Sequence, residues 1–172
     1  MRTPGFTFAY LNKQQLARFL PELFAVLADN MSKIAPTGNS YEEDYRIWSQ
    51  YAVPEMEKDT RKIVIMRAGD LFAGYFQYSI HDDSLLMEEI QIKKEFHGSG
   101  IFTAFYTWLV GELPKDLVFV EAYTSKTNTK TQGILEHLGL VPVGENKNGR
   151  SYFYKGEYRK LLAKYADTSV ET

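Results

Sequence analysis

The sequence predicts a mixed α/β fold in which a mostly antiparallel central sheet is flanked by helices. Several short stretches alternate apolar and polar residues, as half-buried strands do, and others carry apolar residues at helical spacing. One strand-like stretch, 88–92, leads through a glycine turn at 97–100 into a helix-like stretch. The length of 172 residues suits one domain, so we expect 1–172 to form a single domain.

Composition excludes several classes of function. The net charge of −2 gives no overall attraction to nucleic acid or to an anionic membrane. The chain has no cysteine, which excludes disulfides, zinc–thiolate sites and cysteine nucleophiles, and its 3 scattered histidines give no metal-ligand spacing. No stretch approaches the roughly 18 apolar residues of a membrane span, and the first residues lack the apolar run of a signal peptide. We therefore expect a cytoplasmic protein without a metal.

The first half of the chain is expected to hold a strand, helices and three antiparallel strands. Pro21 lies inside the first helical stretch, and a helix-interior proline loses a hydrogen bond and clashes. We therefore expect a break or kink near Leu20, with Pro21 opening a second helical piece. Ser40 and Glu43 form a capping-box pattern for the next helix, and Pro54 is expected to end or bend it. The strands are predicted at 6–11, 62–67, 71–81 and 85–93.

The second half is expected to add a strand, two helices and a hairpin. The glycine turn begins the first helix, whose apolar residues start at Ile101. Gly139 fits a cap at the C-terminal end of the second helix. The terminal helix is expected to be short, with a tail that frays. The predicted elements are a strand at 117–123, a helix at 128–138, a hairpin of 140–143 with 152–154, and a helix at 157–165.

The turn His97-Gly98-Ser99-Gly100 carries the clearest chemical signal. The start of a helix offers unpaired N–H groups and a partial positive charge, and glycines let an anion approach the backbone. The turn therefore predicts an anion site, most simply for a phosphate, although a plain tight turn has the same sequence. The P-loop, the dinucleotide fingerprint and the nucleophile elbow all fail, because the residues around 98–103 break each pattern.

Two motifs resemble those of the GCN5-related N-acetyltransferases (GNAT superfamily). Ile90-x-Ile92, followed after four residues by His97-Gly98-x-Gly100-Ile101, resembles the acetyl-CoA motif. Asn128-x-x-Thr131 with Leu135-Glu136-His137-Leu138-Gly139-Leu140 resembles a later motif of the same superfamily, and the similarity covers roughly residues 6 to 155.

The resemblance implies an acyl-CoA N-acyltransferase (GNAT-like) fold. It also implies transfer of an acetyl group from acetyl-CoA directly to a primary amine of a small molecule or peptide. No nucleic-acid or membrane partner is implied, and a homodimer is left open. The implied cofactor-binding residues are Ile90, Gln91, Ile92, His97, Gly98, Ser99, Gly100, Ile101, Phe102 and Asn128.

Three positions depart from the superfamily pattern. His97 stands where Gln or Arg is usual, and Phe102 stands where a small residue is usual. Leu135 occupies the position of the helix tyrosine that protonates the leaving thiolate. A catalytically degenerate acyl-CoA-binding module with a sensing or structural role is therefore the alternative. A nucleotide-binding protein is a third possibility, but the sequence has no recognisable base or magnesium site.

Direct transfer needs a base for the amine and a proton source for the thiolate. Glu88, Glu89 and Glu121 are the candidate bases. Glu88 has the same strand parity as Ile90 and Ile92, so a core-facing Glu88 would need a partner. Glu89 is preferred because it adjoins the strand segment expected to hold the thioester.

A phenol at Tyr123, Tyr152 or Tyr154 could replace the missing tyrosine, and Tyr154 is our choice. The alternatives are that water supplies the proton or that transfer is slow.

The acceptor pocket is expected to be aromatic. Three aromatic residues share one face of the predicted helix that follows Ser40, and packing of this face on the sheet is the alternative. The expected lining residues are Tyr41, Tyr45, Trp48, Tyr75 and Phe76.

Overall fold

The computed structural model describes residues 5–166, which group into two compact units. The first unit comprises residues 5–78 and 89–99, and the second comprises residues 79–88 and 100–166. Within the described residues, no helix is both long enough and apolar enough to cross a membrane.

The elements follow the predicted order. Within residues 5–166 the strands are β1 (Phe6–Tyr10), β2 (Arg61–Ala68), β3 (Leu71–His81), β4 (Ser84–Ile92), β5 (Phe119–Ser125), β6 (Val141–Glu145) and β7 (Ser151–Glu157). The α-helices are α1 (Leu16–Met31), α2 (Tyr41–Met56), α3 (Ile101–Glu112), α4 (Thr129–His137) and α5 (Tyr158–Tyr165), and the 3-10 helices are η1 (Lys13–Gln15) and η2 (Lys94–Phe96). The tail that was expected to fray lies largely outside the described residues.

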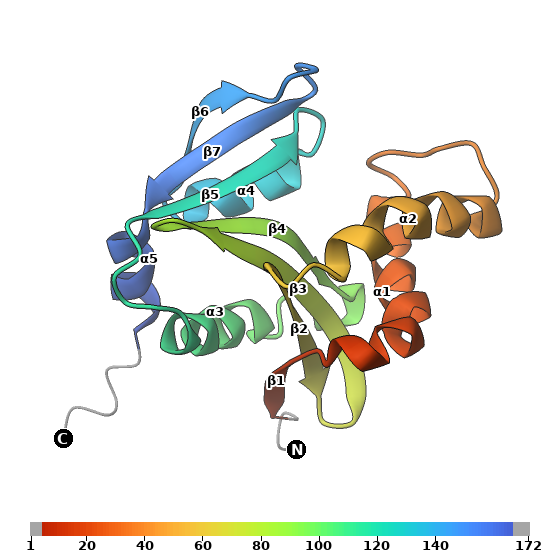
Figure 1. Ribbon diagram of the computed structural model, residues 1–172, viewed down its shortest axis with the longest axis horizontal. Coiled ribbons are helices and arrows are strands. Elements are labelled where there is room, and N and C mark those ends of the chain that lie inside the picture. The colour runs from red at the N-terminus through yellow and green to blue at the C-terminus, as the bar shows by residue number, and fades with distance from the viewer. Residues whose placement is uncertain (1–4, 167–172) are drawn as a thin grey trace. The chain divides into compact units, whose positions relative to one another are not determined.

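Hydrogen bonds link the strands in the order β1-β2-β3-β4-β5-β7-β6 (Figure 1). The β1–β2, β5–β7 and β6–β7 pairs are antiparallel, whereas β4 and β5 are parallel. The parallel register covers Ser84↔Phe119 to Met87↔Ala122, which is the first part of β4. The predicted mixed α/β class, with a mostly antiparallel sheet flanked by helices, is confirmed.

Helix α1 runs without interruption through Pro21, so the predicted break near Leu20 is wrong. Proline costs the helix the hydrogen bond to the carbonyl of Ala17, a penalty of about 3 kcal/mol. The helix nevertheless buries an apolar stripe that includes Leu16, Leu23 and Val26. At roughly 1.5–3 kcal/mol for each buried aliphatic side chain, this burial outweighs the single penalty.

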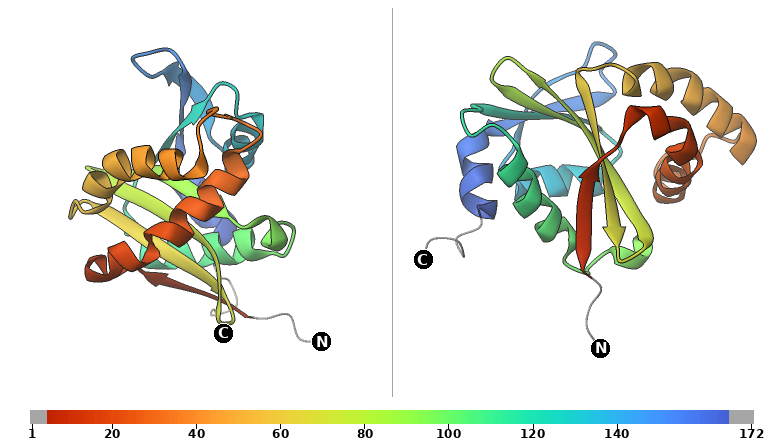
Figure 2. Two further views of the ribbon diagram at one scale, coloured as in Figure 1. Left: turned by 90° about the vertical axis from the view of Figure 1, so that its right-hand side faces the viewer. Right: turned by 60° about the horizontal axis from the view of Figure 1, so that its bottom comes forward.

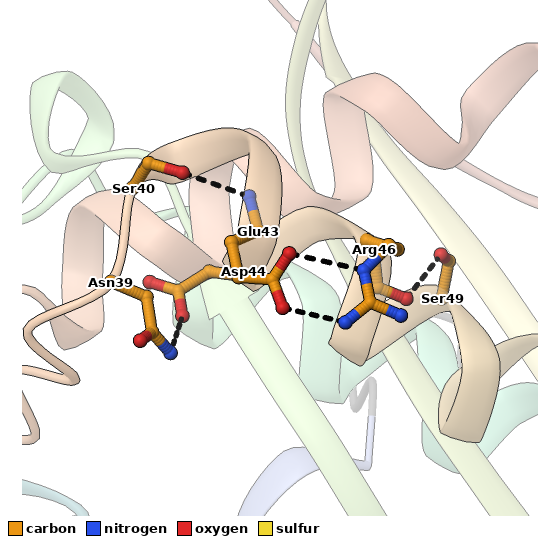
Figure 3. Close-up of polar contacts among 6 residues, drawn as sticks. All are labelled: Asn39, Ser40, Glu43, Asp44, Arg46 and Ser49. Carbon is orange, nitrogen blue, oxygen red and sulfur yellow. Dashed lines mark hydrogen bonds and ion pairs between the residues drawn. The ribbon is translucent and has the colours of Figure 1, made fainter.

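Helix α2 begins at the predicted cap and continues past Pro54 to Met56, so the expectation that Pro54 ends it is wrong. Ser40 Oγ accepts a hydrogen bond from the backbone N–H of Glu43 at 3.2 Å (Figure 3). The Glu43 carboxylate binds the Arg46 guanidinium, with Nε–Oε2 at 3.0 Å, which holds the pKa of Glu43 below its ordinary value. Only the Ser40 half of the predicted capping box is therefore seen.

The first unit buries one apolar cluster between its two long helices and the strands. Helices α1 and α2 lie side by side and cross (Figure 2, left). The cluster joins Leu23 of α1 and Met56 of α2 to Ile63, Ile65 and neighbouring residues of β2 and β3. In the same unit, Asn30 near the C-terminal end of α1 bonds to Gln91 of β4.

The second unit packs helices on its own strands. Helices α3 and α5 lie side by side (Figure 2, right), and α4 lies along β5. Tyr106 of α3 is 1% exposed and contacts Tyr165 of α5, with ring centroids 5.3 Å apart. Gly139 has a φ of +92° after α4, which confirms the predicted glycine cap.

Candidate functional site

The segment after β4 is tightly folded. In the first unit the backbone N–H of Lys93 bonds to the Ala73 carbonyl at 2.8 Å, and η2 follows at once. The His97 ring lies back on the strand, with Nε2 2.9 Å from the Ile92 carbonyl oxygen. Nε2 must donate in this bond, so a neutral ring offers only an acceptor lone pair at Nδ1. This bond fixes the ring against the strand end.

Glycine geometry shapes the turn on both sides of Ser99. Gly98 has a φ of +75°, and Gly100 has a φ of +89° and caps α3 in the left-handed conformation. Such angles are rare for other residues. The hydrogen bond from Ala104 N to Gly100 O, at 3.1 Å, begins the ladder of α3, so the first three amides of the helix have no partner within it. The start of α3 therefore has the backbone geometry that the sequence predicted for an anion site.

Three side chains form a hydrogen-bonded chain that leads from α1 to β4 within the first unit. Asn30 Nδ2 donates to Gln91 Oε1 at 2.9 Å and to the Ile92 carbonyl at 3.0 Å. Gln91 Nε2 in turn donates to Glu89 Oε1 at 2.5 Å. Gln91 is buried, so its amide is fixed in orientation and fixes one oxygen of the Glu89 carboxylate.

Two further contacts hold this region in place. Lys94 Nζ donates to the Asp29 carbonyl at 3.0 Å, beside Asn30. Gly74 lies so close to β4 that a Cβ at this position would be 2.2 Å from the Gln91 carbonyl oxygen. Only a residue without a side chain allows this approach. The backbone around Gln91 is therefore positioned from both α1 and β3.

Tyr75 lies near the Glu89 charge in the same unit. The residue is fully buried, and burial raises the pKa of its phenol well above the ordinary value of 10.0, with the Glu89 charge adding to the effect. Tyr75 also belongs to the core cluster against which Trp48 packs. Phe76, the next residue, is also fully buried and contacts the Tyr78 ring at 5.7 Å between centroids.

The aromatic residues predicted on α2 gather around Phe24 of α1. The Phe24 ring centroid lies 5.1 Å from that of Tyr41 and 5.3 Å from those of Tyr45 and Trp48. Phe24 is buried, whereas Tyr41 is 52% exposed. The predicted face is therefore an aromatic layer whose inner rings pack on α1 and whose outer edge remains accessible.

In the second unit the other proton-transfer candidates point to opposite faces of the sheet. Glu121 pairs in register with Lys155, and Tyr154 pairs with Ala122. Because successive strand residues alternate in direction, Glu121 and Tyr154 lie on opposite faces. Glu121 Oε1 is 3.9 Å from Lys155 Nζ. Burial raises the pKa of the Tyr154 phenol, and the Glu136 charge contributes, so this phenol remains protonated at neutral pH.

Asn128 forms the N-terminal cap of α4. Its Oδ1 accepts a hydrogen bond from Thr131 N at 3.1 Å, and the cap does not use Nδ2. Leu135 is 5% exposed and is the buried residue of this helix. Leu135, which stands where the resembled motif has a tyrosine, therefore serves packing.

Asn30 is the member of the site that the sequence did not reveal. Nothing in the pattern around 30 separates an asparagine that binds Gln91 from one that is solvated at a helix end.

Phe102 is half-buried and contacts Tyr106, with ring centroids 4.7 Å apart. Within residues 5–166 no group of three or more potential metal ligands comes together.

Several solved structures share this architecture. PaiA N-acetyltransferase from Thermoplasma acidophilum, in complex with coenzyme A, has a TM-score of 0.70 and 13% identity over 90% of this chain and 99% of that one. A protein of Desulfovibrio desulfuricans assigned to the GNAT family has a TM-score of 0.67 and 16% identity over 89% of this chain and 99% of that one. The fold is that of the GCN5-related N-acetyltransferases. Spermidine N-acetyltransferase from Vibrio cholerae, in complex with CoA and spermine, has a TM-score of 0.59 and 17% identity over 91% of this chain and 98% of that one.

No protein-family model and no curated protein matches the sequence. The predicted resemblance is thus confirmed at the level of the GNAT fold. The three structures described above, which share this fold, are 13–17% identical to the chain in sequence.

Proposed function

We propose that this protein transfers an acetyl group from acetyl-CoA directly to a primary amine of a small molecule or peptide. The observation that carries the proposal is the glycine-capped start of α3 within a GNAT fold. Backbone amides at the start of α3, 100–102, would bind the pyrophosphate at the positive end of the helix. The Ser99 backbone N–H and hydroxyl instead bond to the Phe96 carbonyl, at 3.2 and 2.5 Å. Backbone groups of Ile90–Ile92 would bind the pantetheine arm as an added strand does, and Asn128 Nδ2 would donate to the same arm.

Glu89 is the proposed base. The Gln91 amide holds one of its carboxylate oxygens, and the carboxylate would accept the amine proton directly or through one water molecule. Tyr154 is the proposed proton donor to the thiolate, because its phenol remains protonated. Tyr41, Tyr45 and Trp48 stay the proposed acceptor-side residues, together with Tyr75 or Phe76, which lie on opposite faces of β3 because they are consecutive strand residues. Neighbours that are named for spermidine support an amine acceptor.

Binding and turnover can be tested separately. A ligand present at a hundred times its Kd stabilises the folded state by about 2.7 kcal/mol, which for a chain of this size raises Tm by roughly 5–11 °C. We expect acetyl-CoA to produce such a shift and Gly100→Asp to abolish it, because the aspartate places negative charge where the pyrophosphate would bind. Gly38→Asp is the matched control, since Gly38 also has a positive φ and open space around it. A full shift in Gly100→Asp would exclude the phosphate-loop assignment.

Turnover is then measured as thiol release from acetyl-CoA over a panel of amines that includes spermidine and peptide amines. Release with at least one amine supports the transferase. The second candidate is an acyl-CoA-binding module without catalysis, which the buried Leu135 favours. A thermal shift without thiol release from any amine would identify that second function.

A further inference from the structure

A pocket of about 480 Å³ opens in the first unit where the ends of β1, β2 and β3 meet. Its aliphatic lining residues are Leu11, which is half-buried, and Ile63, which is buried beneath the pocket floor. The wall carries two phenols, Tyr10 and Tyr78, whose hydroxyl oxygens are 2.8 Å apart. Small-molecule sites typically have volumes of about 300–1,000 Å³ and combine an apolar lining with a few polar groups.

The charges around this pocket are mostly positive. Lys13, Arg61 and Lys62 all line it, whereas its carboxylate is that of Asp59. Three cations and one anion attract an anionic ligand and oppose a cationic one. The lining therefore does not suit the positively charged amines expected at the acceptor site.

Two of these cations are held in place by the protein. Arg61 Nη2 bonds to Glu55 Oε2 at 3.1 Å, and the Arg61 side chain is 16% exposed. Glu55 also pairs with Lys58 at 2.7 Å, so its charge is shared between two cations. Lys13 Nζ donates to the backbone carbonyl of Lys58. Preorganised cations lose less freedom when a ligand binds, and the planar guanidinium matches carboxylate and phosphate oxygens.

The pocket lies away from the strand end that leads into the glycine turn. Tyr78 lines the pocket near the C-terminal end of β3, whereas Ala73, near the start of β3, bonds to Lys93. At about 3.3 Å per strand residue, these two points of the first unit are roughly 17 Å apart.

We propose that this pocket is a second binding site, specific for a small organic anion with an apolar body, either a carboxylate or a phosphate monoester. The anionic group would bind Arg61 and the two lysines. The apolar body would lie against Leu11, beside Tyr10 and Tyr78. The site is independent of acetyl transfer and would exist if the chain had no transferase activity.

The test is a 1H–15N NMR titration of the full chain without acetyl-CoA, using benzoate, phenyl phosphate and the neutral analogue benzamide. We expect amide shifts confined to residues 10–13, 59–63 and 78, and at least tenfold weaker binding of benzamide. The ratio of benzoate to phenyl phosphate affinity distinguishes a carboxylate site from a phosphate site. Raising NaCl from 50 to 500 mM should weaken anion binding, because exposed charges are screened.

A double variant, Lys13→Gln with Lys62→Gln, should weaken anion binding by about tenfold, at roughly threefold for each lysine removed. Lys33→Gln with Lys115→Gln removes the same charge from exposed lysines that do not line the pocket and should leave binding unchanged. The proposal is overturned if benzamide binds as tightly as benzoate, if the shifts lie elsewhere, or if the two double variants behave alike.

Discussion

Gln91 holds Glu89 by a side-chain hydrogen bond of 2.5 Å, and Asn30 fixes Gln91 from the other side. A carboxylate held in this way does not need to be reoriented before it accepts a proton, which is the kind of preorganisation that catalysis rewards. Glu121 of β5 instead lies 3.9 Å from the ammonium of Lys155, its register partner on the neighbouring strand β7. The two candidate bases therefore differ in what surrounds them.

Glu89→Gln keeps the shape of the side chain and removes its charge. We expect turnover to fall by roughly a hundredfold, the usual scale for loss of a general base, with acetyl-CoA affinity unchanged. The rate should partly recover at higher pH, where more of the amine is already neutral. Glu121→Gln is the matched variant, read by the same thiol-release assay. An active Glu89→Gln beside an inactive Glu121→Gln would reverse the assignment. If both variants are active, the amine loses its proton to solvent and neither carboxylate is the base.

Gly74→Ala tests the close approach of β3 to β4. The new methyl group would be 2.2 Å from the Gln91 carbonyl oxygen, so the strand must shift, at a cost of about 1–3 kcal/mol. Because Gln91 positions Glu89, turnover should fall as well. Gly133→Ala in α4 is the control, since nothing lies within 4 Å of its Cβ position and alanine favours a helix by up to about 1 kcal/mol. Urea unfolding measures both changes, and equal stability of the two variants would contradict the contact.

Tyr45→Ala separates an acceptor role from a packing role. The ring contacts Phe24 and Trp48 but is only half-buried, so we expect the free energy of unfolding to fall by about 1–2 kcal/mol. The amine KM should rise by a factor that corresponds to a larger free energy than this. Tyr51→Ala is the control on the same helix, because Tyr51 is 75% exposed. A loss of 3–5 kcal/mol with an unchanged acceptor preference would make Tyr45 a core residue.

Stability should fall above pH 10. Burial raises the phenol pKa of Tyr75, Tyr106 and Tyr154 above the ordinary value of 10.0. Above that pH the unfolded chain loses phenol protons that the folded chain keeps, so the free energy of unfolding decreases as pH rises. Each such group contributes up to about 1.4 kcal/mol per pH unit. Urea midpoints at pH 8, 10 and 11 measure the slope, and Tyr106→Phe should reduce it. An identical slope in Tyr106→Phe would argue against this origin.

The sequence predicted the helices and strands well, because the spacing of apolar residues and the residues that cap helices are local signals. The hairpin β2–β3, the Ser40 cap and the glycine after α4 each depend on a few adjacent residues. Pro21 misled the prediction, because the apolar stripe that offsets its cost extends over the whole helix.

Side-chain pairings were harder to foresee. The capping-box pattern predicts that the Glu43 carboxylate accepts from the Ser40 backbone N–H. It binds the Arg46 guanidinium instead, because a charged donor binds a carboxylate more strongly than a backbone amide does. The bond between Asn30 and Gln91 joins residues far apart in the sequence, and no local pattern encodes it.

The uninterrupted passage of α1 through Pro21 has a consequence for hydrogen exchange. The carbonyl of Ala17 has no amide to bind four residues later, so the first turn of the helix can open without breaking the rest. The distal turn, which carries Asp29 and Asn30, is tied to β4 and η2 by side-chain and main-chain bonds. Deuterium should therefore enter the amides before Pro21 first and those around Asn30 last. Helix α1 then combines a labile start with a protected end, and the protected end is the one that supports Glu89.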